Sequence, residues 1–159
     1  MSLPRILLVS GIPASGKSTY CRWLKDKKRW YHCEGDKVFA NQSDVESAVQ
    51  KAQARSQQTV IDWGFPPRCL SMVQWMESQG VEIWWFDGDR EAAKTSFTKR
   101  NQDRRHPATM QDLKIQLAEI DANWSQIAKV FGSHIIVSVQ DGPKYAGPKR
   151  IFRAMFKSR

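Results

Sequence analysis

Apolar and polar residues alternate along the chain in blocks that predict strands and helices in turn. Several short runs are almost wholly apolar or β-branched, which is typical of strands buried on both faces of a parallel sheet. These runs are Arg5–Ser10, Thr59–Asp62, Val81–Phe86 and His134–Val139, and Trp30–Glu34 is a further plausible strand. The pattern therefore predicts five strands.

The segments between these strands carry helical signals. Ser43 is expected to cap a helix, with Glu46 completing a capping box three residues later. Apolar residues at spacings of three and four predict one long amphipathic helix over Thr109–Phe131, closed by Gly132. The remaining expected helices are Ser18–Lys25, Ser43 to about Arg55, Pro67–Gln79, Glu91 to about Arg105, and Lys149–Phe156, with Asp87-Gly88-Asp89 as a turn and cap. Strands alternating with helices predict an α/β fold with a mostly parallel sheet sandwiched by helices.

Length and composition narrow the class of protein. A chain of 159 residues, 41% of them hydrophobic, without repeats or Gly/Ser linkers, fits one domain over residues 1–159. No apolar run approaches the length of a membrane span, and no signal peptide is evident. The cysteines form no CxxC pair, and the histidines are far apart in the sequence. All six residues are interpreted as structural or incidental, which predicts a reduced, cytoplasmic setting: Cys21, Cys33, Cys69, His32, His106 and His134.

The net charge is strongly positive, with 25 Lys and Arg against 16 Asp and Glu, or +9. The excess gathers in two clusters: Lys94, Lys99, Arg100, Arg104 and Arg105; and Lys144, Lys149, Arg150, Arg153, Lys157 and Arg159. Such a field attracts polyanions such as nucleotides or nucleic acid, but a solvated surface has the same composition. The function of the basic C-terminal helix, residues 148–157, stays open at this point.

The strongest motif is GIPASGKS, which matches GxxxxGK[ST] at every defined position, between a predicted strand and a predicted helix. Gly11 and Gly16 let backbone N–H groups curl around phosphate oxygens, and the helix N-terminus adds unpaired donors. Lys17 is expected to reach the β- and γ-phosphates, and Ser18 to coordinate Mg²⁺. The predicted ATP-binding residues of this loop are Gly11, Ala14, Ser15, Gly16, Lys17, Ser18 and Thr19.

Two absences from the sequence distinguish between classes of P-loop protein. No Asn-Lys-x-Asp motif, which would read guanine in a GTPase, is present. Asp62 ends a predicted strand but is followed by Trp63, so the Glu that polarises water in many ATPases is missing. This favours transfer of phosphate to an acceptor over hydrolysis.

The chain resembles the P-loop kinases that include polynucleotide 5′-hydroxyl kinases, zeta-toxin-like kinases and the gluconate/shikimate-type small-molecule kinases. The resemblance rests on GIPASGKST, on CEGDKVF after the second strand, and on the arginine-spaced KRNQDRR. It implies a P-loop NTPase fold with a short arginine-bearing helical lid over approximately residues 98–109. ATP and Mg²⁺ are the implied cofactors.

Carboxylates at two strand ends are the candidate residues for chemistry. Asp36 follows the second strand at the edge that carries the P-loop, so it should face the γ-phosphate. The resemblance implies that it takes the proton of the attacking hydroxyl; a turn or helix cap is the alternative. Lys37 could hold an anionic acceptor. Asp62 could hold Mg²⁺ through water or fix the Lys or Arg on the acceptor side, and a cap of the next loop is the alternative. Trp63 is either core or a wall of the acceptor site.

The basic helix supplies the remaining candidates. Arg100 and Arg104 lie four residues apart, on one helix face. The resemblance implies that Arg100 stacks over adenine and that Arg104 contacts the transferring phosphate, with Arg105 as a substitute. A guanidinium suits both roles. The alternative is a solvated helix. The resemblance alone implies that the loop at Val139–Lys144 lies along the edge of the adenine.

Three acceptor hypotheses remain open from the sequence. The favoured hypothesis is an ATP-dependent kinase that acts on a hydroxyl. The 5′-hydroxyl of a polynucleotide is a candidate acceptor because the basic tail and Lys37 could bind a phosphate backbone. The alternatives are a kinase for a metabolite or nucleoside, and a nucleotide-dependent module that binds nucleic acid without turnover.

Overall fold

The computed structural model describes residues 2–101, 109–139 and 146–157. Within these ranges five strands form one sheet in the order β2-β3-β1-β4-β5, and each neighbouring pair is parallel. The strands are β1 (Ile6–Gly11), β2 (Tyr31–Glu34), β3 (Thr59–Asp62), β4 (Glu82–Gly88) and β5 (Ile135–Val139). All of the strands predicted from apolar runs are therefore confirmed.

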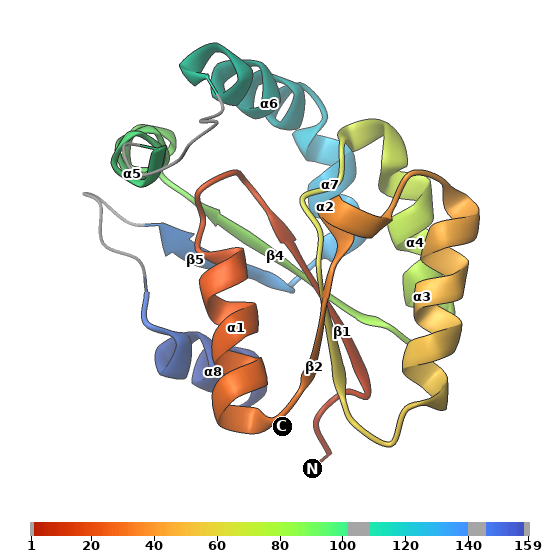
Figure 1. The fold of residues 1–159 in the computed structure, drawn as a ribbon. Helices are drawn as coiled ribbons and strands as arrows, with labels where there is room; N and C mark the ends of the chain where they lie inside the picture. Colours follow the sequence, from red (N-terminus) through yellow and green to blue (C-terminus); the bar gives the residue numbers. More distant parts are fainter. Residues whose placement is uncertain (1, 102–108, 140–145, 158–159) are drawn as a thin grey trace.

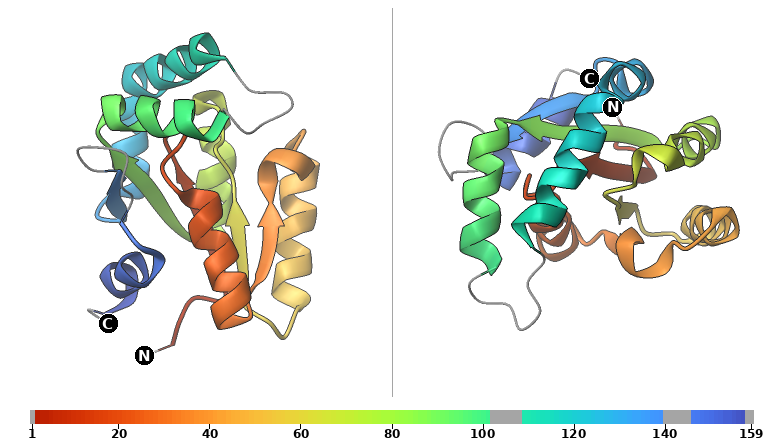
Figure 2. Two further views of the ribbon diagram at one scale, coloured as in Figure 1. Left: turned by 60° about the vertical axis from the view of Figure 1, so that its left-hand side comes forward. Right: turned by 90° about the horizontal axis from the view of Figure 1, so that it is seen from above.

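Helices cover both faces of the sheet. They are α1 (Lys17–Lys28), α2 (Gly35–Val38), α3 (Gln42–Ala54), the 3₁₀ helix η1 (Pro67–Cys69), α4 (Leu70–Ser78), α5 (Arg90–Asn101), α6 (Met110–Ala122), α7 (Trp124–Phe131) and α8 (Pro148–Phe156). Figure 1 shows α1 and α8 on one face, α3, α4 and α7 on the other, and α5 and α6 above the carboxyl ends of the strands. In the view from above in Figure 2, α6 crosses over that edge and α5 runs along one side of it. None of the helices in the described ranges has the length and apolar content required to cross a bilayer.

The alternation of side chains along β1 explains why two separate cores form. Leu7 and Val9 pack into the cluster under α1 and α8, whereas Ile6 and Leu8 pack into the larger cluster on the opposite face. Successive side chains of a strand point to opposite faces, so one wholly apolar strand supplies both cores. A strand buried on both faces is expected at the centre of a parallel sheet.

The adjacent Trp84 and Trp85 of β4 follow the same rule, as predicted. Trp84 lies in the α1/α8 cluster and stacks on His134 with a ring-centroid distance of 4.3 Å. Trp85 lies in the opposite cluster, 5.5 Å from the ring of Phe131. Both rings are core residues, which leaves neither available as a ligand platform.

The start of α3 differs from the prediction. Its N-cap is Asn41, whose side-chain oxygen accepts a hydrogen bond of 3.0 Å from the N–H of Asp44. Asp44 in turn accepts a bond of 2.9 Å from the N–H of Ala40. The predicted cap, Ser43, lies inside the helix. Asn is as favourable an N-cap residue as Ser. The pair Asn41 and Asp44 is therefore a stronger signal for the start of the helix than the pair Ser43 and Glu46.

The predicted long helix over residues 109–131 is two helices in the structure. Thr109 begins α6 with a capping box, in which its hydroxyl accepts from the N–H of Asp112 and the Asp112 carboxylate accepts from the N–H of Thr109. The helix ends at Asn123, and α7 then runs to Phe131 before Gly132. The break was invisible to periodicity because the apolar spacing continues through it.

Candidate active site

The loop between β1 and α1 has the geometry of a phosphate cradle. Gly11 has φ +147°, and a Cβ on it would lie 2.2 Å from the carbonyl oxygen of Phe86 on β4, so only glycine fits there. Gly16, with φ +85°, turns the chain into α1. Ala14 also has a positive φ, of 58°. These conformations turn the loop back on itself, and the first N–H groups of α1 lack helical partners.

The side chain of Lys17 lies across this loop. Its ammonium donates to the carbonyl oxygen of Ile12 at 2.7 Å and to that of Gly11 at 3.2 Å. Burial lowers the pKa of Lys17, and the negative charges of Asp62 and Asp36 oppose that shift. The lysine therefore lies within electrostatic reach of two carboxylates, at the end of the sheet where the P-loop lies.

A long-range hydrogen bond fixes the other end of the loop. The hydroxyl of Ser138, on β5, donates to the backbone carbonyl oxygen of Ser15 at 2.7 Å, and both residues are buried. This bond joins residues 123 positions apart in the chain. It ties the P-loop to the strand at the far side of β4, and nothing local in the sequence predicted it.

A pocket of about 400 Å³ opens directly beside the P-loop. Its walls come from the P-loop, from the carboxyl ends of β2 and β3, and from α5 and α6. The lining residues are Gly11, Pro13, Ala14, Lys17, Ser18, Asp36, Asp62, Gly64, Phe65, Pro66, Pro67, Phe97, Arg100, Gln116, Glu119 and Ile120. The volume lies in the range of small-molecule sites, ~300–1,000 Å³.

Asp36 lies in this pocket as the sequence predicted. It sits in α2, the single helical turn that follows β2, and that turn is held close to β3 because Gly35 packs against the side chain of Trp63. Desolvation raises the pKa of Asp36, while Lys17 and a hydrogen bond from the N–H of Gly64 act in the opposite direction. Asp36 nevertheless remains accessible to solvent. A carboxylate with these neighbours can accept a proton.

Asp62 is the deeper of the two carboxylates. It ends β3, is 6% exposed, and lines the same pocket as Lys17. One of its oxygens, Oδ2, lies 3.5 Å from Nε2 of His32. With the Ser18 hydroxyl also in the lining, the pocket offers the oxygen ligands that Mg²⁺ prefers. The residues present therefore fit both a nucleotide phosphate and Mg²⁺.

Arg100 also belongs to the pocket, from α5. Its guanidinium carbon lies 5.6 Å from the ring centre of Phe97, and its charge contributes to the lowering of the Lys17 pKa. A position within electrostatic reach of Lys17 favours contact with a phosphate over stacking on adenine. The other arginines of the expected lid, Arg104 and Arg105, and the predicted adenine loop from position 140 onward lie outside the described residues.

Three other predicted residues do not line the pocket. Lys37 forms an ion pair with Glu34, and 76% of its side chain is exposed. Thr19 is exposed on α1 and does not line the pocket. Trp63 is core: it is 4% exposed and packs edge-on against Phe39, with ring centres 5.0 Å apart.

Sequence reasoning missed the contribution of α6. Gln116, Glu119 and Ile120 reach the pocket because α6 crosses above the strand ends, and only Ile120 belonged to the predicted apolar stripe. A second hollow of about 620 Å³ continues from the first, sharing Pro66, Pro67 and Glu119 with it. Its other lining residues are Arg68, Leu70, Ser71, Gln74, Asn123 and Gln126. The sequence shows that this helix carries polar residues on one face, but it does not show that this face lies over the pocket.

Comparison with known proteins places the fold. No protein-family model and no curated protein sequence matches the chain. Among solved structures, shikimate kinase from Acinetobacter baumannii in complex with shikimate is similar with a TM-score of 0.68 and 12% identity, covering 99% of this chain and 96% of that one. A gluconokinase from Sinorhizobium meliloti 1021 is similar with a TM-score of 0.62 and 13% identity, covering 98% of this chain and 91% of that one. YorR from Bacillus subtilis, in complex with phosphorylated GDP, is similar with a TM-score of 0.60 and 12% identity, covering 96% of this chain and 94% of that one.

The chain has the P-loop kinase fold. The predicted fold class, a five-stranded parallel sheet between helices, is confirmed by the sheet order and by these neighbours. At the level of fold, the likeness supports the gluconate/shikimate branch of the resemblance. It adds no support for the polynucleotide or zeta-toxin branches.

Proposed function

We propose that this protein is a kinase that transfers the γ-phosphoryl group of Mg·ATP to a hydroxyl group of a small molecule. One observation carries the proposal: Lys17, Asp36 and Asp62 converge on a single pocket of about 400 Å³ beside the P-loop. The fold shared with shikimate kinase and gluconokinase, which by name act on small hydroxylated acids, gives it further support.

The P-loop and Lys17 are the residues that bind phosphate in this proposal. Loop N–H groups surround the phosphate oxygens, and the Lys17 ammonium exchanges its bonds to the Ile12 and Gly11 carbonyls for phosphate oxygens. Arg100 stabilises charge on the transferring group from the α5 side. Ser18 and Asp62 would hold Mg²⁺. When bound there, the ion would neutralise charge that develops on the phosphates.

Asp36 acts as the base. Its carboxylate is accessible from the pocket, and its raised pKa makes it a better proton acceptor than an ordinary aspartate. It takes the proton of the acceptor hydroxyl as that oxygen bonds to the γ-phosphorus, while the bond from the γ-phosphorus to the bridging oxygen breaks and ADP leaves. Lys17, whose charge favours the ionised form of Asp36, keeps that carboxylate available at neutral pH.

The second hollow is where the acceptor would extend. It adjoins the phosphate pocket at Pro66, Pro67 and Glu119, and it is lined by amide and hydroxyl groups together with the exposed guanidinium of Arg68. Such a lining suits a small polyhydroxylated molecule that carries an anionic group. Lys37 was the predicted anion contact, and Arg68 is better placed for that role.

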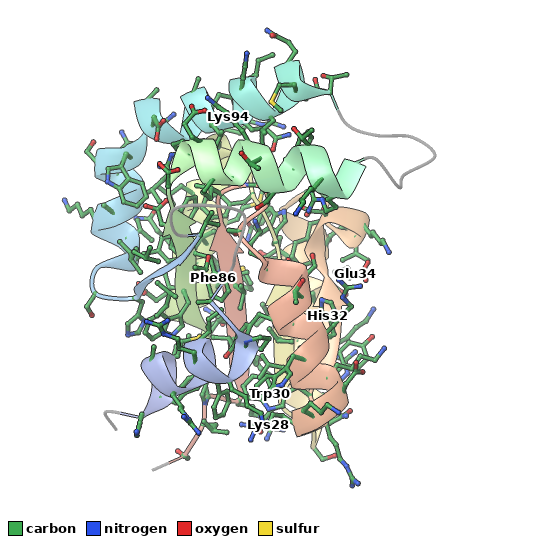
Figure 3. All side chains as sticks on the ribbon, turned by 90° about the vertical axis from the view of Figure 1, so that its left-hand side faces the viewer. Lys28, Trp30, His32, Glu34, Phe86 and Lys94 are labelled. Carbon is green, nitrogen blue, oxygen red and sulfur yellow. The ribbon has the colours of Figure 1, made fainter. Side chains whose placement is uncertain are left out.

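The basic C-terminal helix lies away from this site, which argues against a polynucleotide acceptor bound by that helix. Phe152 of α8 packs on Trp23 of α1 with ring centres 5.6 Å apart, and Lys28, at the last turn of α1, lies over Phe152 at 4.8 Å. This is the end of α1 opposite the P-loop. Figure 3 shows Lys28 near the bottom of the molecule and Lys94 of α5 at the top.

The test is transfer of labelled γ-phosphate from ATP with Mg²⁺ to a panel of sugar acids, cyclic hydroxy acids, polyols and nucleosides, with 5′-hydroxyl oligonucleotides in parallel. Lys17→Ala is the control, because it removes the phosphate-binding ammonium and should abolish transfer without unfolding the chain. Label on a small molecule supports the proposal. Label on the oligonucleotide alone, or ATP binding without transfer to any member, contradicts it.

A further inference from the structure

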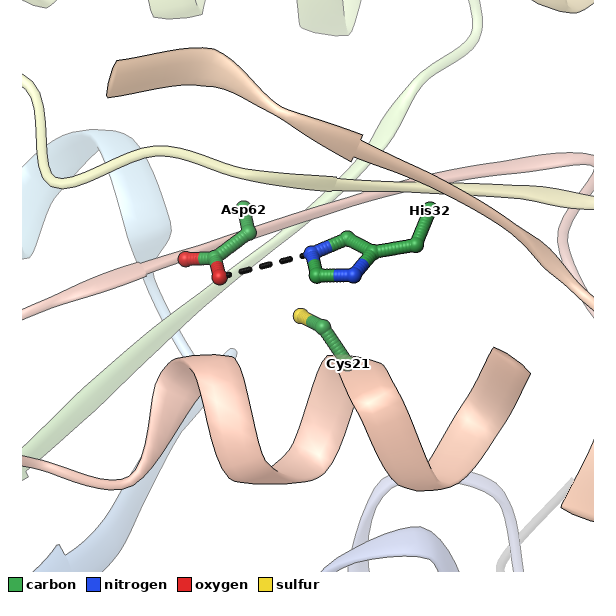
Figure 4. A group of neighbouring side chains, drawn as sticks. All are labelled: Cys21, His32 and Asp62. Atoms are coloured by element: carbon green, nitrogen blue, oxygen red, sulfur yellow. Dashed lines mark ion pairs between the residues drawn. The ribbon is translucent and has the colours of Figure 1, made fainter. Parts of the chain in front are cut away.

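Beneath the P-loop, three side chains of different chemistry meet inside the protein. Cys21 comes from α1, His32 from β2 and Asp62 from the end of β3, as Figure 4 shows. The thiol sulfur, an imidazole nitrogen and a carboxylate oxygen all lie within 4.8 Å of one another. Along the sequence Cys21 and His32 gave no sign of a shared site, and both were interpreted as structural.

The sheet register explains the convergence. His32 pairs with Val60 across the parallel strands, and Asp62 is two residues further along β3. Residues two apart on a strand share a face, so His32 and Asp62 project to the same side of the sheet. That is the side covered by α1, whose Cys21 lies one helical turn after Lys17.

The cluster is buried and incompletely bonded. The side chains of His32 and Asp62 are 6% and 7% exposed, and Cys21 is fully buried. The contact of 3.5 Å between His32 Nε2 and Asp62 does not meet hydrogen-bond geometry, and Nε2 has no hydrogen-bond partner within the described part of the chain. A buried, unpaired ring nitrogen is costly, so its presence between two other ligand atoms points to a bound group.

We propose that Cys21, His32 and Asp62 form a binding site for a thiophilic divalent cation of the Zn²⁺ type. Sulfur, nitrogen and oxygen together suit Zn²⁺, whereas Mg²⁺ prefers oxygen ligands alone. The site is distinct from the Mg²⁺ position proposed beside Ser18, although Asp62 borders both.

Binding requires only small movements. Zn²⁺ takes sulfur at about 2.3 Å and nitrogen or oxygen at about 2.0–2.2 Å, which places ligand atoms roughly 3.5 Å apart. Ligand atoms that lie up to 4.8 Å apart would therefore have to approach one another by roughly 1.3 Å at most. The Cys21 thiol loses its proton to solvent as the sulfur bonds the ion, neutral His32 binds through Nε2, and water completes the coordination.

Occupation of this site affects the neighbouring pocket. Asp62 also lines the phosphate pocket and is one of the two residues proposed to hold Mg²⁺ there, so Zn²⁺ bound to Asp62 would withdraw that carboxylate from Mg²⁺. Zn²⁺ should therefore inhibit phosphoryl transfer at saturating Mg·ATP. This consequence rests on the proposed function, whereas the binding itself does not.

Binding is tested directly on the full chain, with a non-thiol reductant present. Zn²⁺ affinity is measured by competition with a chromophoric chelator, and Co²⁺ serves as a spectroscopic probe. We expect one equivalent of metal, a thiolate-to-cobalt charge-transfer band and the visible bands of tetrahedral Co²⁺. Cys21→Ser should remove the charge-transfer band, and Cys21→Ser and His32→Gln should each weaken binding by about tenfold or more.

Cys33→Ser is the matched control. Cys33 adjoins His32 on β2 but packs against the cluster on the opposite face of the sheet, so metal binding should survive its substitution. Wild-type protein without a charge-transfer band overturns the proposal whether or not the variants fold, as does loss of the band in Cys33→Ser but not in Cys21→Ser. Zn²⁺ that binds at the site without slowing an active enzyme would refute the inhibitory coupling alone.

Discussion

The buried hydroxyl of Ser138 donates a hydrogen bond of 2.7 Å to the backbone carbonyl oxygen of Ser15, which joins β5 to the P-loop. Ser138→Ala leaves that buried carbonyl without this donor, which costs about 1–3 kcal/mol of unfolding free energy. Because the loop loses an anchor, the Kd for Mg·ATP should also rise, by roughly three- to tenfold. Denaturant unfolding and nucleotide titration measure the two effects. Exposed Ser133→Ala is the control, and equal behaviour of the two variants would refute the anchoring role.

The contact between Gly11 and Phe86 makes a second prediction. A Cβ at Gly11 would lie 2.2 Å from the Phe86 carbonyl oxygen at a positive φ, so Gly11→Ala must displace the P-loop or β4. We expect a loss of more than about 3 kcal/mol of stability, or a folded protein that no longer binds ATP. Gly147→Ala is the comparison, because nothing lies within 4 Å of its added Cβ. A Gly11→Ala protein with normal melting temperature and ATP affinity would contradict the described loop.

The start of α3 allows a direct contest between two caps. Asn41→Ala removes the hydrogen bond from the Asp44 N–H and should lower the unfolding free energy by about 1 kcal/mol. Ser43→Ala lies inside the helix and should change it by less than about 0.5 kcal/mol. Paired chemical denaturation of the two variants checks this. A larger loss of unfolding free energy in Ser43→Ala than in Asn41→Ala would mean that the helix starts where the spacing of Ser43 and Glu46 predicted.

The raised pKa of Asp36 links activity and stability to pH. A carboxyl group with a higher pKa in the folded than in the unfolded protein contributes stability below the unfolded pKa, and loses that contribution as pH rises through the folded pKa. Asp36→Asn should therefore melt at a higher temperature than wild type at neutral pH. The difference should shrink as pH falls below the ordinary range of aspartate.

The same shift predicts the acid limb of the activity profile. Because the base must be ionised, kcat/KM should fall on acidification through a pKa above that of an ordinary aspartate. Thermal melts and initial rates over a pH series measure both effects. A wild-type protein that is more stable than Asp36→Asn at neutral pH would show that Asp36 is not desolvated as described.

Local patterns predicted most of the fold. Each strand was an uninterrupted apolar run such as Arg5–Ser10, because a parallel sheet buries both faces, and GxxxxGK[ST] identified the loop from Gly11 to Ser18. Asp36 and Asp62 were predicted from their places at strand ends, which share one edge in a parallel sheet. These inferences depend only on neighbours in sequence and on the shared direction of the strands.

What escaped prediction depends on contacts between distant segments. The bond from Ser138 to Ser15 and the meeting of Cys21 with His32 arise from sheet order and register, which a single sequence does not display. Glu119 reaches the pocket because of the path that α6 takes. The end of α6 at Asn123 was hidden for a different reason, since the apolar periodicity runs through it unchanged.

In the proposed reaction, Asp36 takes the proton of an acceptor hydroxyl beside a P-loop that binds ATP. The most direct test is the rate of γ-phosphoryl transfer by Asp36→Asn, measured with the best small-molecule acceptor of the panel and alongside the Kd for Mg·ATP. We expect kcat to fall by about 100-fold or more while the Kd for Mg·ATP changes by less than about twofold. A variant that transfers phosphate at the wild-type rate would contradict the proposed reaction.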